Sequence, residues 1–148
     1  MSPLSRRFLA TAALFLATGL AMGFWMLVRR ELLGVWPLPH LVSAHAHLML
    51  VGTVMETIIG VAIWLFPRPA QGDTRHRPWL AEGAWWLITA GTLLRALSET
   101  ARAWDNSAIL RWAVVIGGAL QLIGLLAGIT YLRPRIRSVG AGLRAIAG

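Results

Sequence analysis

Four long apolar stretches, separated by short polar segments, organise the chain. They run from Phe8 to Val28, from Leu41 to Phe66, from Trp79 to Leu97 and from Ile109 to Leu132. A helix of about 20 apolar residues crosses the hydrocarbon core of a bilayer, and backbone polar groups in lipid must bond within their own segment. The pattern therefore predicts one all-α domain over residues 1–148, an integral membrane four-helix bundle.

The residues between the stretches agree with this division. Prolines precede and follow the second stretch and end the fourth, and Asp105 or Ser107 is expected to cap the start of the fourth. His76 falls in the polar loop before the third stretch, where we expect it to be solvated. The tail from Arg135 to Gly148 is expected to form a short amphipathic surface helix.

Composition supports a lipid environment. Hydrophobic residues make up 57% of the chain and charged residues only 14%, whereas a soluble domain has about a quarter of its residues charged. The net charge of +8 comes from arginines in short clusters between apolar runs, which is typical of membrane flanks and does not indicate nucleic-acid binding. Tryptophans gather near the ends of the runs, as in an interfacial aromatic belt: Trp25, Trp36, Trp64, Trp79, Trp85, Trp104 and Trp112.

The arginines also predict an orientation, because positive residues favour the cytoplasmic side. With four spans, one side of the membrane holds Arg6, Arg7, Arg68, Arg75, Arg77, Arg133, Arg135, Arg137 and Arg144. The opposite side holds Arg29, Arg30, Arg102 and Arg111. We therefore expect both termini to be cytoplasmic in a bacterial inner membrane.

Two glycine patterns predict close helix packing. Gly19 and Gly23 form a GxxxG motif in the first stretch, and Gly124 and Gly128 form another in the fourth, with Gly117 on the same face. We expect these faces to support a homo-oligomer or membership of a larger membrane complex.

Three histidines lie at the start of the second stretch. His45 and His47 are two residues apart and point about 200° apart on a helix, so they cannot bind one metal ion together. His45 shares its face with Met49, Gly52 and Glu56. His40 and His47 share another face, about 10 Å apart, and His40 is expected to place its polar tip among the headgroups.

Charged residues at the end of the third stretch meet the histidines at the same membrane depth. Arg95, Glu99 and Arg102 follow i, i+4, i+7 spacing and form one polar stripe. A haem needs an imidazole for its iron and cations for its propionates, so we expect this stripe to face His45. The small residues Ala44, Ala46 and Gly52 would leave space for the macrocycle.

Glu56 lies about 16 Å deeper along the helix than His45. An ionisable group inside a membrane is costly and is usually functional. Glu56 is either a proton-relay group or a structural hydrogen-bond partner, and Gln121 in the fourth stretch is one candidate partner.

The second stretch resembles a helix of a known family. The segment from Ser43 to Met49, followed by Gly60 and by Leu65 to Arg68, is similar to the second helix of subunit I of haem–copper oxidases and nitric oxide reductases. The resemblance implies that His45 binds a low-spin haem near the outer surface, with Met49 and Gly52 under the ring, and that His47 is an alternative ligand. Because the chain has no cysteine for thioether attachment, the haem would be of the b type.

The resemblance covers only this helix. The family's subunit I has many more spans, and its later helices supply the other haem and copper ligands, whereas the third and fourth stretches here contain no histidine. A haem at His45 would be five-coordinate, or completed by another chain, or the site is degenerate, and oxidase activity by this chain alone is not expected.

Three functions remain open at this point. The first is a haem-binding membrane protein that transfers electrons, senses a gas or accompanies a larger respiratory complex. The second is a non-haem structural or assembly subunit. The third is a metal-handling protein that uses His40, His45, His47, Glu56 and Glu99.

Overall fold

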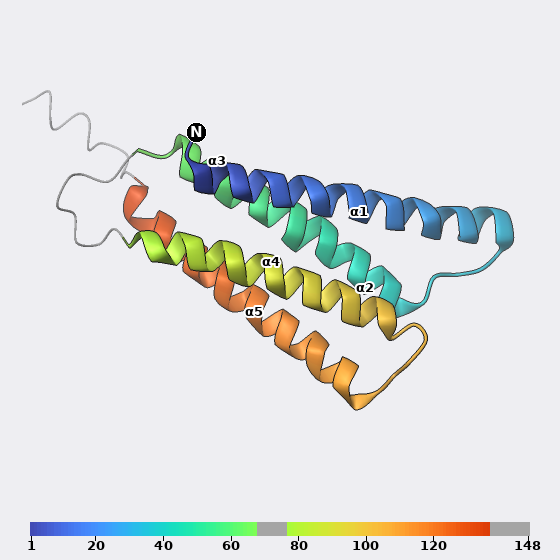
Figure 1. Cartoon of the computed structure of the whole chain (residues 1–148). Helices are drawn as coiled ribbons and strands as arrows, with labels where there is room; N and C mark the ends of the chain where they lie inside the picture. Colours follow the sequence, from blue (N-terminus) through green and yellow to red (C-terminus); the bar gives the residue numbers. More distant parts are fainter. Residues whose placement is uncertain (68–76, 137–148) are drawn as a thin grey trace, which may run out of the picture.

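The computed structural model of the protein describes residues 1–67 and 77–136, and within these ranges every regular element is a helix. In chain order the helices are α1 (Pro3–Leu33), α2 (Pro39–His47), η1 (Leu48–Met55), α3 (Glu56–Leu65), α4 (Pro78–Ala101), α5 (Ala108–Leu132) and η2 (Arg133–Arg135). Because α2, η1 and α3 follow one another without a break, they form one rod. The four rods of Figure 1 therefore match the four predicted stretches to within a few residues, except at the ends of α1.

Two expectations fall partly or wholly outside the described residues. The loop at 68–76 contains His76, and residues 137–148 contain most of the predicted surface helix. At the start of that tail, Arg133–Arg135 forms one turn of 3-10 helix.

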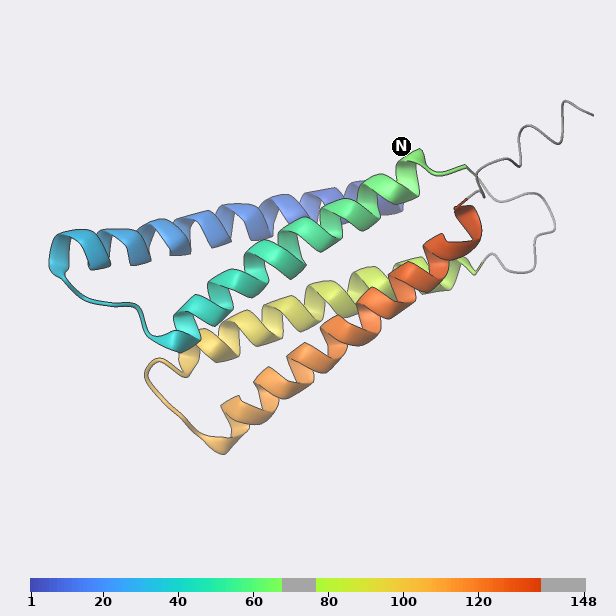
Figure 2. The same cartoon turned by 180° about the vertical axis from the view of Figure 1, so that it is seen from behind.

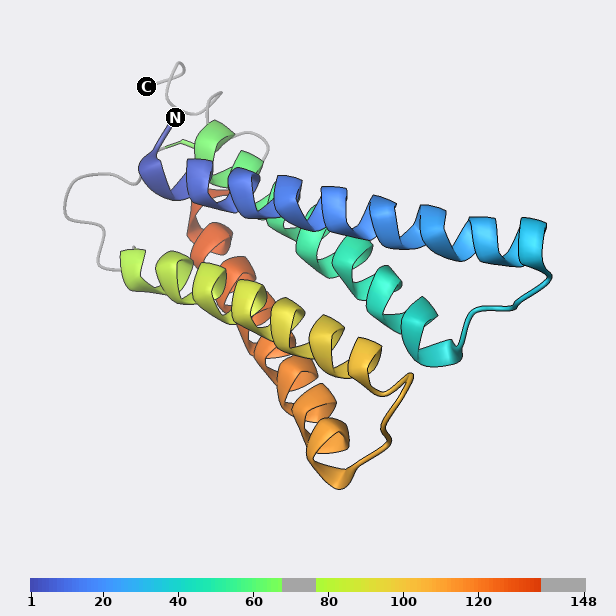
Figure 3. The same ribbon diagram turned by 45° about the vertical axis from the view of Figure 1, so that its right-hand side comes forward.

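The rods form two antiparallel hairpins. α1 packs along η1 and α3, α5 packs along α4, and α4 contacts α2 and η1 (Figure 3). We call the end where α1 begins and α3 ends the N-terminal end, and the end that carries α2 the histidine end. Figure 2 shows that α1 and α5 diverge toward the histidine end. α4 contacts each of the other three rods.

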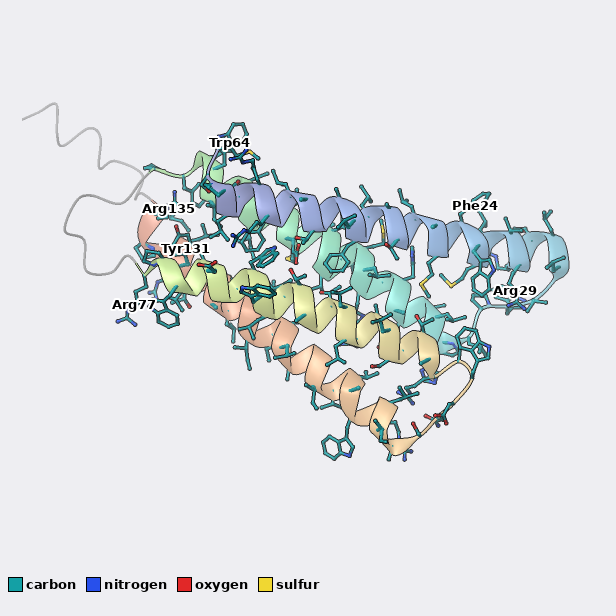
Figure 4. The ribbon with its side chains drawn as sticks, viewed as in Figure 1. Phe24, Arg29, Trp64, Arg77, Tyr131 and Arg135 are labelled. Carbon is teal, nitrogen blue, oxygen red and sulfur yellow. The ribbon has the colours of Figure 1, made fainter. Side chains whose placement is uncertain are left out.

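Three rods are long and apolar enough to cross a membrane: Pro3–Leu33, Pro39–Leu65 and Ala108–Arg135. α4 has 24 residues and is about 36 Å long, so its length would suffice. Its composition is less apolar because threonines, Arg95 and Glu99 lie on it, and several of these residues contact other helices. The outward side chains of the other rods are largely apolar, as Phe24 and Trp64 illustrate in Figure 4.

The glycine motifs pack inside the chain. A Cβ atom on Gly124 would come 2.9 Å from the backbone nitrogen of Ile88, and one on Gly117 would come 2.9 Å from that of Arg95. Gly19 and Gly23 are covered by side chains of the neighbouring rod. Close packing is therefore confirmed, but the expected use of these faces for a second chain is wrong, because α4 and the α2–η1 rod occupy them.

Two features of the helices were not expected. α1 continues past Val28 to Leu33 because Arg29, Arg30 and Glu31 are compatible with a helix, and it ends at Gly34, whose φ of 65° suits glycine. η1 has π-helical geometry, and its wider turn lets the Thr53 hydroxyl donate to the carbonyl of Leu48 at 3.0 Å.

Candidate functional site

The imidazole of His45 fills a space that glycines leave on α1. A Cβ atom on Gly23 would lie 2.7 Å from His45 Cε1. Nδ1 lies 2.9 Å from the carbonyl oxygen of Gly19. A carbonyl oxygen only accepts, so Nδ1 carries the hydrogen, and a neutral imidazole then has its free lone pair on Nε2. This tautomer suits a ligand histidine, whose second nitrogen is usually held in this way.

An open groove of about 400 Å³ lies beside His45, between α1 and the start of the second rod. Its walls are mainly apolar, and Arg30 is the charged residue that lines it. The full lining is Gly23, Met26, Leu27, Arg30, Pro37, Val42 and His45. The volume falls within the range of about 300–1,000 Å³ that is usual for ligand sites.

Met49 and Gly52 do not line this groove. A Cβ atom on Gly19 would lie 2.6 Å from Met49 Sδ, and one on Gly52 would lie 2.7 Å from the ring of Phe15. His45, Met49, Gly52 and Glu56 share one face of the helix, as predicted, and this face packs on α1. The side chains of α1 occupy the place that was expected to hold a macrocycle.

His47 lies on a different side of the helix from His45. Its Nδ1 donates to the carbonyl oxygen of Ser43, four residues earlier, at 2.9 Å. The hydroxyl of Ser43 in turn donates to Glu99 on α4 at 2.8 Å. His47 therefore lies on the face of the helix that carries Ser43, which binds α4, whereas His45 binds α1.

The charged stripe on α4 is divided. Arg95 Nε donates to Glu99 Oε1 at 3.1 Å, beside Ser43, and the Arg95 side chain lies against Gly117 and Gly118 of α5. Arg102 instead binds the side chain of Asn106 in the turn after α4. The expected clamp of two arginines is not assembled, because the charge of Arg95 is paired and Arg102 points to the surface.

One carboxylate oxygen of Glu99 is available for a further hydrogen bond. The residue is only 4% exposed. Its Oε1 accepts from Ser43 and Arg95, whereas Oε2 is buried and has no hydrogen-bond partner among the described residues. A buried acceptor without a donor costs about 1–3 kcal/mol, so Oε2 can take one further donor.

Glu56 is fully buried where α1, α3 and α4 meet. Thr11 of α1 and Thr89 of α4 bind its two carboxyl oxygens. The suggested partner Gln121 is wrong, because its amide donates to Thr92 at 3.1 Å. The pairing of α4 with α5 at this level brings Gln121 to Thr92 and keeps it from Glu56.

The residues of the metal-handling hypothesis do not come together. Within residues 1–67 and 77–136, no three His, Asp or Glu side chains are close enough to hold a metal ion. His45 binds α1, Glu99 binds Ser43 and Arg95, and Glu56 binds threonines.

Several contributing residues were missed from the sequence. Arg30 was counted only as a flanking charge, and Thr11 and Thr89 were ordinary members of apolar stretches. A hydroxyl inside each of two stretches was the available signal for a buried polar contact, but it did not say which helices would meet.

Comparison with known proteins gives no match, since no family model, curated protein or solved structure is significantly similar to the chain. Fold and composition define the chain as an all-helical protein with at least three helices suited to a membrane.

Proposed function

We propose that the chain is a small membrane haem protein in which Nε2 of His45 binds the iron of a b-type haem. The observation that carries this proposal is the bond from His45 Nδ1 to the carbonyl of Gly19, which leaves Nε2 as the lone-pair nitrogen. Without cysteine in the sequence, the haem would be held only by ligation and packing. When bound, the haem would supply reversible one-electron transfer or a site for a diatomic gas.

The groove beside His45 is a better fit for the macrocycle than the Met49 face. Apolar residues of α1 and of the start of the second rod would hold the ring, and Arg30 would neutralise a propionate. Arg30 is now paired with Glu31 in an exposed contact, and such pairs contribute only about 0–1 kcal/mol. Arg30 can therefore exchange this partner for a propionate at little cost.

The same proposal includes the membrane arrangement. All four rods span the bilayer, both termini are cytoplasmic, and the histidine end faces the outer side of a bacterial inner membrane. The arginine distribution supports this orientation. Because the groove is open at the bundle surface, a second chain would cover the exposed side of the haem, as homo-oligomer or partner subunit.

A structural role for His45 is the competing explanation. The bond to Gly19 also joins α1 to α2, and a small assembly subunit would use it for that purpose alone. Asparagine separates the two roles, because its Nδ2 can occupy the place of the imidazole Nδ1 and donate to the same carbonyl, while no atom replaces Nε2.

The test compares His45→Asn with His47→Asn in protein purified after expression with ample haem. His47 is a matched control, since its Nδ1 also donates to a carbonyl. We expect a Soret band in the wild type and in His47→Asn, and its loss in His45→Asn with unchanged helical circular dichroism.

Two results would overturn the proposal. The first is a wild-type protein without a Soret band, and the second is a His45→Asn variant that keeps the band. In the first case the non-haem structural subunit becomes the better explanation. In the second case another residue binds the haem, and His45 only joins α1 to α2.

A further inference from the structure

A second buried site lies toward the N-terminal end of the bundle, around Glu56. Thr89 donates to Glu56 Oε1 at 2.8 Å, and Thr11 Oγ1 contacts Glu56 Oε2. The indole N–H of Trp85 donates to the same Thr11 oxygen at 3.2 Å. Three rods thus contribute to one polar cluster inside the bundle.

The hydrogen bonds around Thr11 can all be made with a proton on Glu56. A threonine hydroxyl has one hydrogen and two lone pairs. Thr11 Oγ1 lies 3.0 Å from the carbonyl of Arg7 and 3.1 Å from that of Phe8, and these oxygens only accept. If Thr11 donates to a carbonyl, its contact with Glu56 requires a hydrogen on the carboxyl group. With Glu56 protonated, Thr11 accepts from Glu56 and from Trp85, and every group is satisfied.

The charges around Glu56 agree with a neutral carboxyl group. On the packed helices, Arg7 of α1 and Glu82 of α4 pair with each other at 3.0 Å on the exposed surface, and Arg95 of α4 pairs with Glu99 at 3.1 Å. η1 and α3 have no other charged residue, α5 has only Arg111 near its start, and Arg135 of η2 binds the far end of α3. A carboxylate at Glu56 would therefore be buried without a counter-ion among the described residues, which is strongly unfavourable.

The exposed Arg7–Glu82 pair lies close to this cluster. Arg7 and Thr11 are four residues apart on α1, about 6 Å along the helix. The Arg7 guanidinium lies 5.7 Å from the ring centre of Trp85, which in turn holds Thr11. Thr11 and Trp85 thus connect Glu56 to this charged pair. Of the two, only the hydroxyl can both accept and release a proton.

We propose that Glu56 is a proton-binding site that exchanges its proton with water at the N-terminal end of the bundle through the hydroxyl of Thr11. In the release step the O–H bond of Glu56 breaks and its proton passes to Thr11 Oγ1. Thr11 gives up its original hydroxyl proton to water beside Arg7 and Glu82. The Thr11 hydroxyl then turns toward Glu56, and the carboxylate accepts from Thr11 and Thr89. This site is independent of haem binding.

Infrared spectroscopy of the full-length protein in lipid bilayers tests the site directly, through the carbonyl stretch of a protonated carboxyl group. We expect this band in the wild type near neutral pH, its disappearance as the pH is raised, and its shift in D₂O. Glu56→Gln should lack the band, because the amide can bond to both threonines but holds no acidic proton. Glu99→Gln should retain it.

Thr11→Val and Thr89→Val distinguish a proton-transfer route from a purely structural contact. Each variant removes one hydrogen bond to Glu56, but only Thr11→Val removes the proposed proton carrier. We expect Thr11→Val to slow hydrogen–deuterium exchange of the carboxyl band about tenfold or more, since a positioned proton carrier is lost. Thr89→Val should exchange at nearly the wild-type rate. If Glu56→Gln does not fold, isotope labelling of the glutamate carboxyl groups in the wild type and in Glu99→Gln assigns the same band.

The proposal is overturned if the wild type has no such band at any pH at which it is folded, or if the band does not respond to pH. Equal slowing by the two valine variants would also overturn it and would leave Glu56 as a structural link between three helices.

Discussion

At the scale of single residues, the position of His45 depends on the absence of a side chain at Gly23. Gly23 gives the imidazole its space, and Gly19 provides the carbonyl that fixes its tautomer. The GxxxG motif of α1, which the sequence suggests as a helix-packing signal, therefore holds a histidine ring against the helix.

Gly23→Ala should disturb this contact. The added Cβ atom would lie 2.7 Å from His45 Cε1, so the ring or the helix must shift, and overpacking of this kind costs about 1–3 kcal/mol. The free energy of unfolding in detergent, followed by circular dichroism, measures the loss.

Gly83→Ala is the matched control, because a Cβ atom there has nothing within 4 Å. Alanine is better than glycine inside a helix by about 0.5–1 kcal/mol, so this variant should be as stable as the wild type or slightly more stable. A Gly23→Ala variant with the stability of Gly83→Ala would contradict the tight contact at His45.

At the scale of elements, the end of α3 is completed by a residue from the far end of the chain. The last carbonyls of a helix have no partner within it. Arg135 donates to the carbonyls of Ile63, Phe66 and Pro67 at 2.8–3.1 Å and also contacts Tyr131 (Figure 4). One arginine thus caps the second rod and fixes η2 against it.

Arg135→Gln should destabilise the bundle by about 1–3 kcal/mol, because buried carbonyl groups lose their donors. Arg133→Gln removes the same charge from an exposed position two residues earlier and should have little effect. Denaturant titration of both variants gives the comparison. Equal stability of the two variants would show that the cap is not needed.

At the scale of the whole molecule, α4 is the rod whose membrane crossing depends on its neighbours. Its side chains are bonded to the other three rods. Trp85 binds Thr11 of α1, Thr89 and Glu99 bind Glu56 and Ser43 of the second rod, and Thr92 binds Gln121 of α5. A helix of this kind is stable in lipid when partners cover its polar groups. We therefore expect α4 to span the bilayer as the central member of the bundle.

Reporter fusions test this topology. A phosphatase that is active only outside the cytoplasm should be silent when it is fused after Gly148 and active when it is fused at Asn106, in the turn between α4 and α5. The arginine distribution predicts this orientation. If α4 does not cross, the turn at Asn106 stays cytoplasmic and α5 carries the C-terminus to the outer side. A silent Asn106 fusion together with an active Gly148 fusion would therefore refute four spans.

The amino-acid sequence by itself determined the number of helices, their approximate bounds and the residues that are costly in lipid. These properties follow from local composition. Each apolar run is long enough to cross the bilayer, prolines and Gly34 end helices, and a histidine or glutamate inside an apolar run is costly in lipid. The sequence also determined that His45 and His47 face different directions, because two residues on a helix are about 200° apart.

Only the tertiary structure decided which groups meet. Glu56 binds Thr11 and Thr89 instead of Gln121. Arg95 forms an ion pair with Glu99, and the glycine motifs are covered by other helices of the same chain. Helical periodicity gives the face on which a residue lies, but not which rod covers that face or how far the rods slide along each other. That choice depends on the simultaneous packing of all four rods, in which small residues allow close approach and each buried polar group must find a partner.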